Sequence, residues 1–160
     1  MLTPGYTLRR GSGLDRALLV KFMHRTYQEL YPEARLAHLA QTVDRYMSGE
    51  TPLWWIESKT ETTPIACLWL GLAIDQVSGQ QYPHIFLLYV SPEHRRQGIG
   101  SALMHQAENW AKARGDCQIG LQVFQQNQPA LGLYQKLGFQ PQWLGMVKPL
   151  RESGSRTGLD

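Results

Sequence analysis

The chain has 160 residues, of which 42% are hydrophobic and 18% charged, as is typical of one globular domain and not of a disordered protein. Lysines and arginines exceed acidic residues by only three, so the composition argues against a dedicated nucleic-acid-binding protein. We expect a single domain over residues 1–150 and a flexible tail over residues 151–160, where apolar periodicity is lacking.

The spacing of the cysteines and the length of the apolar runs argue against a metal-binding, membrane-spanning or secreted protein. Cys67 and Cys117 stand 50 residues apart with no CxxC pattern, which predicts two core thiols of a cytosolic protein and no metal site. The longest apolar run, residues 65–74, is too short to span a bilayer as a helix, and the N-terminal ten residues lack an apolar signal region. These features predict a cytoplasmic protein without membrane or nucleic-acid partners.

The first third of the chain predicts a strand and two helices. A short strand over residues 7–10 precedes a helix, and Ser12 and Asp15 have the spacing of a capping box at its start. Apolar residues at helical spacing from Leu36 to Tyr46 predict the second helix.

Three apolar runs in the middle of the chain are strand candidates. Residues 52–58 and 65–74 are rich in aromatic and aliphatic side chains. Periodicity alone leaves open a buried helix for the second run, but its length and flanks favour a strand. Residues 84–90 are apolar on both faces and predict a central strand.

The second half alternates helices and strands. A helix from Ile99 to Gly115 and a strand over residues 119–124 follow the central strand, so these two strands should be parallel. A last helix begins near Asn127 and ends at Gly138, and residues 139–147 should return as a closing hairpin. The expected fold is a mixed α/β sheet with helices on both faces.

The segment between the central strand and the next helix carries the clearest chemical signal. Free N–H groups at a helix N-terminus attract anions, and Gly98 and Gly100 let a phosphate approach the backbone. Arg95 and Arg96 add positive charge. Neither GxxxxGK[ST] nor GxGxxG is present, because Leu103 stands at the third glycine position of the latter. A solvated basic loop that merely begins a helix is the alternative interpretation.

A second motif follows the next strand, and together the two resemble the GNAT superfamily of N-acetyltransferases. The first family signature, [QR]xxGx[GA], is matched by Arg95, Gly98 and Gly100. The second, an asparagine-led helix that ends in Gly-Phe, is matched by Asn127, Ala130, Leu133, Tyr134, Gly138 and Phe139. The resemblance is clear over residues 84–140. It implies the family fold, a mostly antiparallel twisted sheet in which one parallel strand pair splays apart.

The resemblance also implies acetyl-CoA as the acyl donor and an amine as the acceptor. In the family, the strand equivalent to residues 88–90 is bulged and the pantetheine arm lies against its open edge. This implies a binding set of Leu88, Tyr89, Val90, Arg95, Arg96, Gln97, Gly98, Ile99, Gly100, Ser101 and Asn127. The loop residues of this set would surround the diphosphate, and backbone groups of the strand would contact the pantetheine and the acetyl carbonyl.

Tyr134 is the one side chain for which the resemblance implies a catalytic role, protonation of the thiolate that leaves. The general base stays open. Ribosomal-protein acetyltransferases of the family carry a glutamate five residues before the motif asparagine, whereas this chain has Gln122, which cannot act as a base. Glu29 and Glu33 flank the connection between the first two helices, which borders the acceptor site in the family. Glu57 and His84 lie on predicted strands, and none of the four is assigned as the base.

Aromatic residues suggest walls for an acceptor pocket. The candidates are Tyr27, Tyr31, Trp54, Trp55, Trp69 and Trp143, with Trp69 expected in the core and Trp143, on the closing hairpin, expected to face the acceptor. A non-catalytic acyl-CoA-binding module is the second functional hypothesis, and a homodimer is compatible with both.

Overall fold

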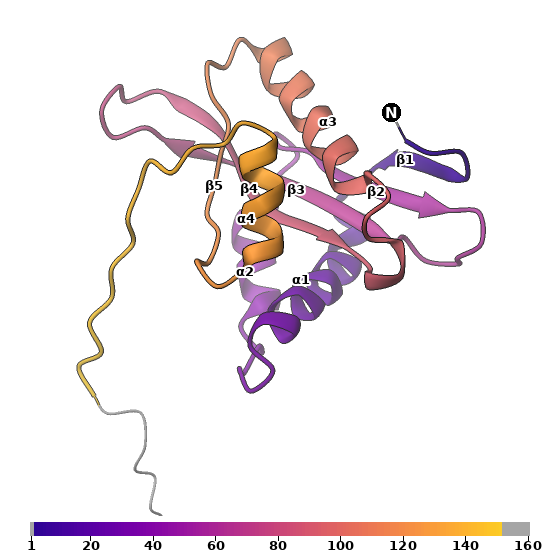
Figure 1. Cartoon of the computed structure of the whole chain (residues 1–160), viewed down its shortest axis with the longest axis horizontal. Helices are drawn as coiled ribbons and strands as arrows, with labels where there is room; N and C mark the ends of the chain where they lie inside the picture. Colours follow the sequence, from indigo (N-terminus) through magenta and orange to yellow (C-terminus); the bar gives the residue numbers. More distant parts are fainter. Residues whose placement is uncertain (1, 152–160) are drawn as a thin grey trace, which may run out of the picture.

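The structure, a computed structural model, describes residues 2–151 and is built on one five-stranded sheet (Figure 1). The strands lie in chain order: β1 (Tyr6–Arg10), β2 (Leu53–Ser58), β3 (Ala66–Ile74), β4 (Gln81–Val90) and β5 (Gly120–Leu121). Strands β1 to β4 pair with one another in antiparallel fashion, whereas β5 is parallel to β4. The expected mixed sheet with one parallel pair is therefore confirmed.

Four helices cover the two faces of this sheet (Figure 1). They are α1 (Arg16–Leu30), α2 (Leu39–Tyr46), α3 (Ile99–Arg114) and α4 (Gln128–Lys136). Buried side chains of α1 and α2 form one core cluster with the sheet, and those of α3 form a second cluster against which α4 packs. Within residues 2–151, no helix combines the length and apolar character that crossing a membrane requires.

Strands β2 and β3 are largely apolar because both faces of the sheet are buried there. In β2, Trp55 joins the cluster under α1 and α2, whereas Trp54 and Ile56 join the cluster under α3. Side chains that alternate between faces meet a hydrophobic neighbour on either side. The strand interpretation of residues 65–74 is confirmed, and the buried-helix alternative is wrong.

A bulge in β4 interrupts this alternation. Trp69 pairs with Leu87 but the next residue, Leu70, pairs with Ile85, so Phe86 is an extra residue in β4. As a result Ile85 faces α3 while Leu87 faces α1. The ring of Phe86 lies over Gly71, where an added Cβ would stand only 1.9 Å from the Phe86 Cε2 atom.

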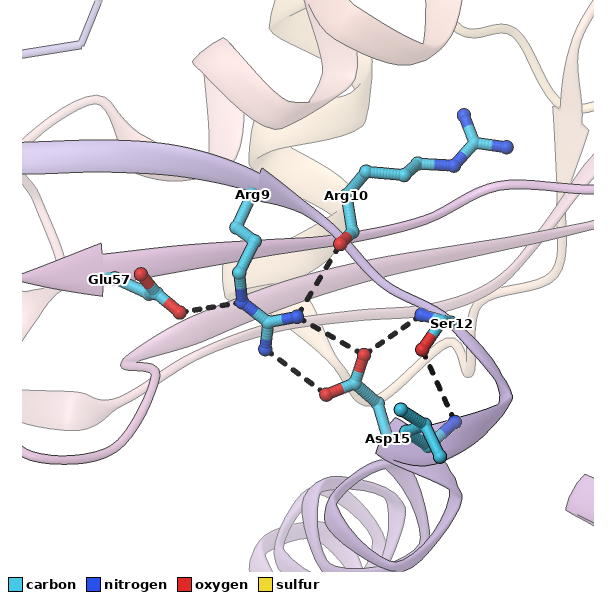
Figure 2. A network of polar contacts seen from close by, with 6 residues as sticks. Arg9, Arg10, Ser12, Asp15 and Glu57 are labelled. Atoms are coloured by element: carbon cyan, nitrogen blue, oxygen red, sulfur yellow. Dashed lines mark hydrogen bonds and ion pairs between the residues drawn. The ribbon is translucent and has the colours of Figure 1, made fainter.

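The start of α1 is stabilised by the capping box expected from Ser12 and Asp15 (Figure 2). Asp15 accepts the N–H of Ser12 at 2.8 Å and the guanidinium of Arg9 at 3.1 and 3.2 Å. Arg9 also donates to Glu57 at 2.6 Å. Burial raises the pKa of Asp15, but the bonds from Arg9 and Ser12 outweigh it and leave that pKa below its usual range. The box caps a short 3-10 turn, Gly13–Asp15, that leads into α1.

Two expected elements differ in the structure. The strand predicted over residues 119–124 is paired only at Gly120 and Leu121. The closing hairpin is wrong, since no strand is found between Phe139 and Arg151 and the chain leaves the body after α4 (Figure 1). So short a β5 gives a returning strand little edge to pair with, and Pro141 lacks the N–H that a ladder needs.

Other expectations need smaller corrections. Trp143 is 66% exposed on the segment after α4, without the hairpin that was to carry it toward an acceptor. Cys67 is buried as expected, but Cys117 is exposed because it lies in the surface loop two residues after Gly115 ends α3. The second helix begins at Leu39 and not at Leu36. The tail expected over residues 151–160 lies, from residue 152 on, outside the described residues.

Candidate active site

The segment from Ser91 to α3 presents a row of free backbone donors. In the described part of the chain, the N–H groups of residues 96–101 form no hydrogen bond, and the first helical bond runs from Ala102 N to Gly98 O at 3.0 Å. Arg96 and Gly98 both have left-handed backbones, with φ of 62° and 78°. Successive N–H groups in such a turn, at the positive end of a helix dipole, favour an anion.

Glycine is favoured at positions 98 and 100 of this segment for two different structural reasons. Gly98 needs its left-handed backbone, and the space beside it is open. Gly100 lies in the first turn of α3, where an added Cβ would approach Cδ2 of Leu133 in α4 to 3.3 Å. Gly100 therefore also lets α3 and α4 pack closely.

The edge of β4 that faces β5 is open beyond the bulge. Parallel pairing covers only His84 with Gly120 and Ile85 with Leu121, although β4 continues to Val90. The N–H of Ser91 points toward β3, where it donates to Ile65 O at 2.8 Å. Since neighbouring residues of a strand direct their backbone groups to opposite edges, Val90 and Leu88 direct theirs toward the gap. An extended ligand could pair with this edge as an added strand.

Arg95 is engaged within the protein. Its Nε donates to Val90 O at 2.8 Å, and its Nη2 donates to the Glu29 carboxylate at 2.7 and 2.9 Å. The same guanidinium lies 5.7 Å from the ring centre of Tyr89, whose hydroxyl donates to Glu29 at 3.1 Å. By contrast, the exposed side chain of Arg96 makes no hydrogen bond or ion pair within residues 2–151.

The second motif builds the start and the end of α4. Asn127 caps the helix, with its Oδ1 accepting the N–H of Ala130 at 3.4 Å. At the other end, Phe139 N donates to Tyr134 O at 2.9 Å and Gly138 N to Gln135 O at 3.1 Å. This is a Schellman turn with a left-handed glycine, and the ring of Phe139 packs edge-on against Tyr134 with centroids 5.7 Å apart.

Tyr134 therefore has its ring positioned by the end of its own helix. The residue packs against the core cluster under α3. Burial raises the pKa of Tyr134 to about 12, so its hydroxyl is protonated at neutral pH. No hydrogen bond of this hydroxyl occurs among the described residues, which leaves its proton available to a ligand.

The residues considered as a general base differ in whether their side chains are already bonded within the protein. Glu29 has both oxygens engaged by Arg95, and Glu57 is paired with Arg9 at 2.6 Å. Glu33 and Gln122 are exposed.

His84 is the remaining candidate and is half-buried, 5.7 Å from the ring of Phe86. Burial lowers its pKa, and its Nδ1 is buried with no hydrogen-bond partner among residues 2–151. His84 is thus neutral at physiological pH, and its backbone is paired with Gly120 at the end of the β4–β5 ladder that lies away from the open edge.

The aromatic candidates divide between core and gap. Trp54, Trp55 and Trp69 are buried, as expected for Trp69. Tyr27 packs at the margin of the core cluster under α1. Tyr31 meets Phe124 edge to face at 5.3 Å, so of this group it lies nearest to the segment after β5.

A cavity of about 600 Å³ lies at the end of β4, on the side of β3 and not on the side of β5. It is lined by polar residues of α1, of the β2–β3 connection and of the segment after β4, among them Arg25, Glu29, Glu61, Tyr89 and His94. The Glu29 side chain belongs both to this cavity and to the ion pair with Arg95.

Sequence reasoning did not find the contacts that hold the loop. Tyr6 at the start of β1 bonds Gln97 and His94, and Glu29 bonds Arg95, across 91, 88 and 66 positions of sequence. No local pattern marks such pairs, because only the folded sheet brings β1, α1 and the end of β4 together.

The bulged central strand, the short parallel pair and the anion-receptive helix start are the features that the resemblance to N-acetyltransferases implied. The model of the "Acetyltransferase (GNAT) family" matches residues 20–139 of this chain. The chain belongs to that family.

Individual relatives agree with this assignment. The chain is 34% identical over 87 residues to an uncharacterized N-acetyltransferase of Methanocaldococcus jannaschii, with 51% of this chain and 37% of that protein covered. It is 32% identical to an aminoglycoside N(6')-acetyltransferase type 1 of Acinetobacter genomosp. 13, over 69% of this chain and 77% of the relative. The matched region is thus about a third of the first relative's length and three quarters of the second's.

A solved structure shows the same fold. The predicted acetyltransferase with acetyl-CoA from Clostridium acetobutylicum superposes with a TM-score of 0.73 at 21% identity. The match covers 89% of this chain and 96% of that one.

Proposed function

We propose that this protein transfers an acetyl group from acetyl-CoA to a primary amine of a small molecule or a peptide. The observation that carries the proposal is the row of unbonded N–H groups over residues 96–101 beside the open edge of β4. The row suits a diphosphate and the edge suits the amides of a pantetheine arm, so the residues present fit acetyl-CoA. Family membership supports the same cosubstrate.

The proposed binding set follows these two features. Loop residues Arg95, Arg96, Gln97, Gly98, Ile99, Gly100 and Ser101 surround the diphosphate. Arg96 supplies exposed charge, whereas Arg95 acts through loop shape because its guanidinium is held by Glu29 and Val90. Leu88, Tyr89 and Val90 border the pantetheine, and the free amide nitrogen of Asn127 can reach it from the start of α4.

The reaction is direct attack by the neutral amine on the thioester carbonyl. A new C–N bond forms and the C–S bond breaks. The attacking nitrogen gives up one proton to water as it becomes an amide, and the departing thiolate takes up one proton to become the free thiol. The N–H of Val90 can stabilise the negative charge that develops on the carbonyl oxygen. The Tyr134 hydroxyl, protonated at neutral pH, is the proposed donor to the thiolate.

The acceptor must reach the site without a proton on its amine. A free alkylamine has a pKa near ~10.4, so the proton has to leave to a base or to water. Because Glu29 is engaged and Gln122 has no basic group, no carboxylate is assigned this step. The aminoglycoside relative supports an amine on a small polar molecule as the first acceptor class to screen.

A non-catalytic acyl-CoA-binding module is the second candidate function. The observation that favours it is Gln122, whose exposed side-chain amide cannot act as a base. Ribosomal-protein acetyltransferases of the resembled family carry a glutamate at this position. Under this alternative, acetyl-CoA would bind tightly but no thiol would be released across a broad amine panel.

Calorimetry with acetyl-CoA is the direct experiment. We expect saturable binding that Gly98→Val and Gly100→Val weaken at least about tenfold, because valine is strained at the positive φ of Gly98 and a side chain at Gly100 presses on Leu133, so that either change distorts the loop that receives the diphosphate. No binding at millimolar cosubstrate would overturn the proposal. An acceptor screen that measures free thiol then separates transfer from simple binding.

Homodimer formation and a cytoplasmic location stay predictions. Exposed apolar side chains after α4, at Trp143, Leu144, Met146, Val147 and Leu150, support a second copy as partner for that segment. Sedimentation equilibrium checks this: a monomer at all concentrations would contradict it. The single-domain assignment of residues 1–150 is likewise a prediction.

A further inference from the structure

Two side chains from distant elements hold the loop on either side of Arg96. Gln97 is bonded by Tyr6 of β1, and Arg95 is bonded by Glu29 of α1. Arg96 between them has a φ of 62°, a left-handed conformation that a residue other than glycine seldom adopts. Such a conformation persists where the surroundings hold it in place.

The first tether runs from β1 to the loop. The Tyr6 hydroxyl donates to Oε1 of Gln97 at 2.9 Å and lies 2.8 Å from Nδ1 of His94. Since the single hydroxyl proton goes to Gln97, a bond to the Tyr6 oxygen from His94 requires the tautomer that has its proton on Nδ1. Thr3 adds a longer bond of 3.5 Å from its hydroxyl to the Gln97 carbonyl.

The second tether runs from the last turn of α1. Glu29 accepts two bonds from Nη2 of Arg95, at 2.7 and 2.9 Å, and one from the Tyr89 hydroxyl at 3.1 Å. Arg95 passes this restraint to the end of β4 through its bond to Val90 O. Charge-assisted bonds of this kind are stronger than neutral ones and directional.

We infer that Tyr6 and Glu29 are positioning residues that hold the loop in its anion-receptive shape before the diphosphate arrives. The inference rests on the proposed function, because it assumes that the amides of residues 96–101 receive the diphosphate. A loop ordered in advance binds more tightly, since less conformational entropy is lost on binding. Glu29 in this role holds the loop and takes no proton from the acceptor.

Calorimetry with CoA tests the effect on affinity. The variants are Tyr6→Phe and Glu29→Gln, which keep side-chain shape, with Tyr46→Phe and Glu33→Gln as matched controls that leave both tethers intact. Each tether variant should bind CoA about 3- to 30-fold more weakly, the range expected for a lost neutral or charged hydrogen bond. The controls should stay within about twofold, a difference too small for a lost hydrogen bond. Melting curves ensure that all titrations are made on folded protein.

Backbone dynamics of the ligand-free proteins supply a readout that general destabilisation would not move. In ¹⁵N relaxation, the heteronuclear NOE of the amides at 95–98 should fall in both tether variants while amides of β3 and α3 stay unchanged. Unchanged loop amides, or a more mobile loop with unchanged CoA affinity, would overturn the inference. A wild-type protein that binds no CoA would overturn the proposed function instead, and the relaxation result would still decide whether the tethers order the loop.

Discussion

The hydroxyl of Tyr31 accepts a 2.6 Å hydrogen bond from Nε2 of Gln126, which joins the segment after α1 to the segment after β5. The neighbouring Phe124 ring meets Tyr31 edge to face. Two residues earlier, Glu29 joins α1 to the end of β4 through Tyr89 and Arg95. The end of α1 therefore connects the two parallel strands where their own pairing has stopped.

Removing the bond between Tyr31 and Gln126 should loosen this connection. We expect Gln126→Ala to lower the free energy of unfolding by about 0.5–1.5 kcal/mol, the usual contribution of one hydrogen bond. Urea denaturation measures it, and Gln125→Ala, an exposed neighbour, is the control. Equal losses in the two variants would show that the bond contributes nothing.

The capping box at Asp15 should make stability depend on acid pH. Asp15→Asn should cost about 1 kcal/mol at pH 7, since it weakens a helix cap and removes the charge opposite Arg9. Because the folded state lowers the pKa of Asp15, this contribution is present above pH 4 and is lost as the pH falls through the folded-state pKa. Denaturation curves from pH 7 to pH 2 should therefore converge for wild type and variant. Exposed Glu50→Gln provides the comparison, and a gap that persists at pH 2 would contradict the assignment.

Gly98 and Gly100 should differ in their effect on folding. Gly98→Ala should destabilise the protein by about 1–2 kcal/mol, because alanine is strained at the positive φ of this position. Gly100→Ala should change stability by less than about 0.5 kcal/mol, since its Cβ would meet only the flexible end of Leu133. Chemical denaturation of the two variants checks the order, and the reverse order would be incompatible with the backbone found here.

Tyr134→Phe should separate catalysis from folding. The melting temperature should stay within about 2 °C, because the hydroxyl has no hydrogen bond to lose within residues 2–151. Turnover should fall about a hundredfold or more while acetyl-CoA affinity changes less than about twofold, as expected when a general acid is removed. Equal losses in turnover and affinity would indicate a structural role.

The raised pKa of Tyr134 also predicts alkaline behaviour. With a folded-state pKa of about 12, the wild-type rate should not decline below pH 10 through this group. An unfolded tyrosine gives up its proton near pH ~10, so the stability from this residue is present below that pH and is lost as the pH rises toward 12. The stability of Tyr134→Phe should accordingly fall less steeply over this interval.

The two cysteines should differ in reactivity. Cys117 is exposed and should react with a thiol reagent in the native protein within minutes. Cys67 is fully buried, and burial strongly raises the pKa of its thiol, so it should react only after unfolding. Labelling followed by mass spectrometry of peptides gives the assignment; modification of native Cys67 would contradict its place in the core.

Local patterns in the sequence were sufficient for most of the elements and for the two motifs. Ser12 and Asp15 predicted the start of α1, and the run from residue 65 to 74 predicted β3, because caps and apolar runs act over a few neighbouring positions. Where pairing needed a distant partner, the local pattern predicted too much strand: only Gly120 and Leu121 of residues 119–124 pair in the sheet, and residues 139–147 form no strand.

The sequence by itself determined the order of the elements, the family and the loop with its free donors, since these depend on residue type and spacing along the chain. Only the tertiary structure decided what Arg95 does, because its partners Glu29 and Val90 come from an α-helix and a strand that meet only in the fold. The same holds for the turn at Gly138 and Phe139. The sequence predicted that the helix ends at Gly138, but only the folded helix end shows that Phe139 packs against the ring of Tyr134. Spacing specifies which groups are present, and packing across the sheet decides which of them are free to meet a ligand.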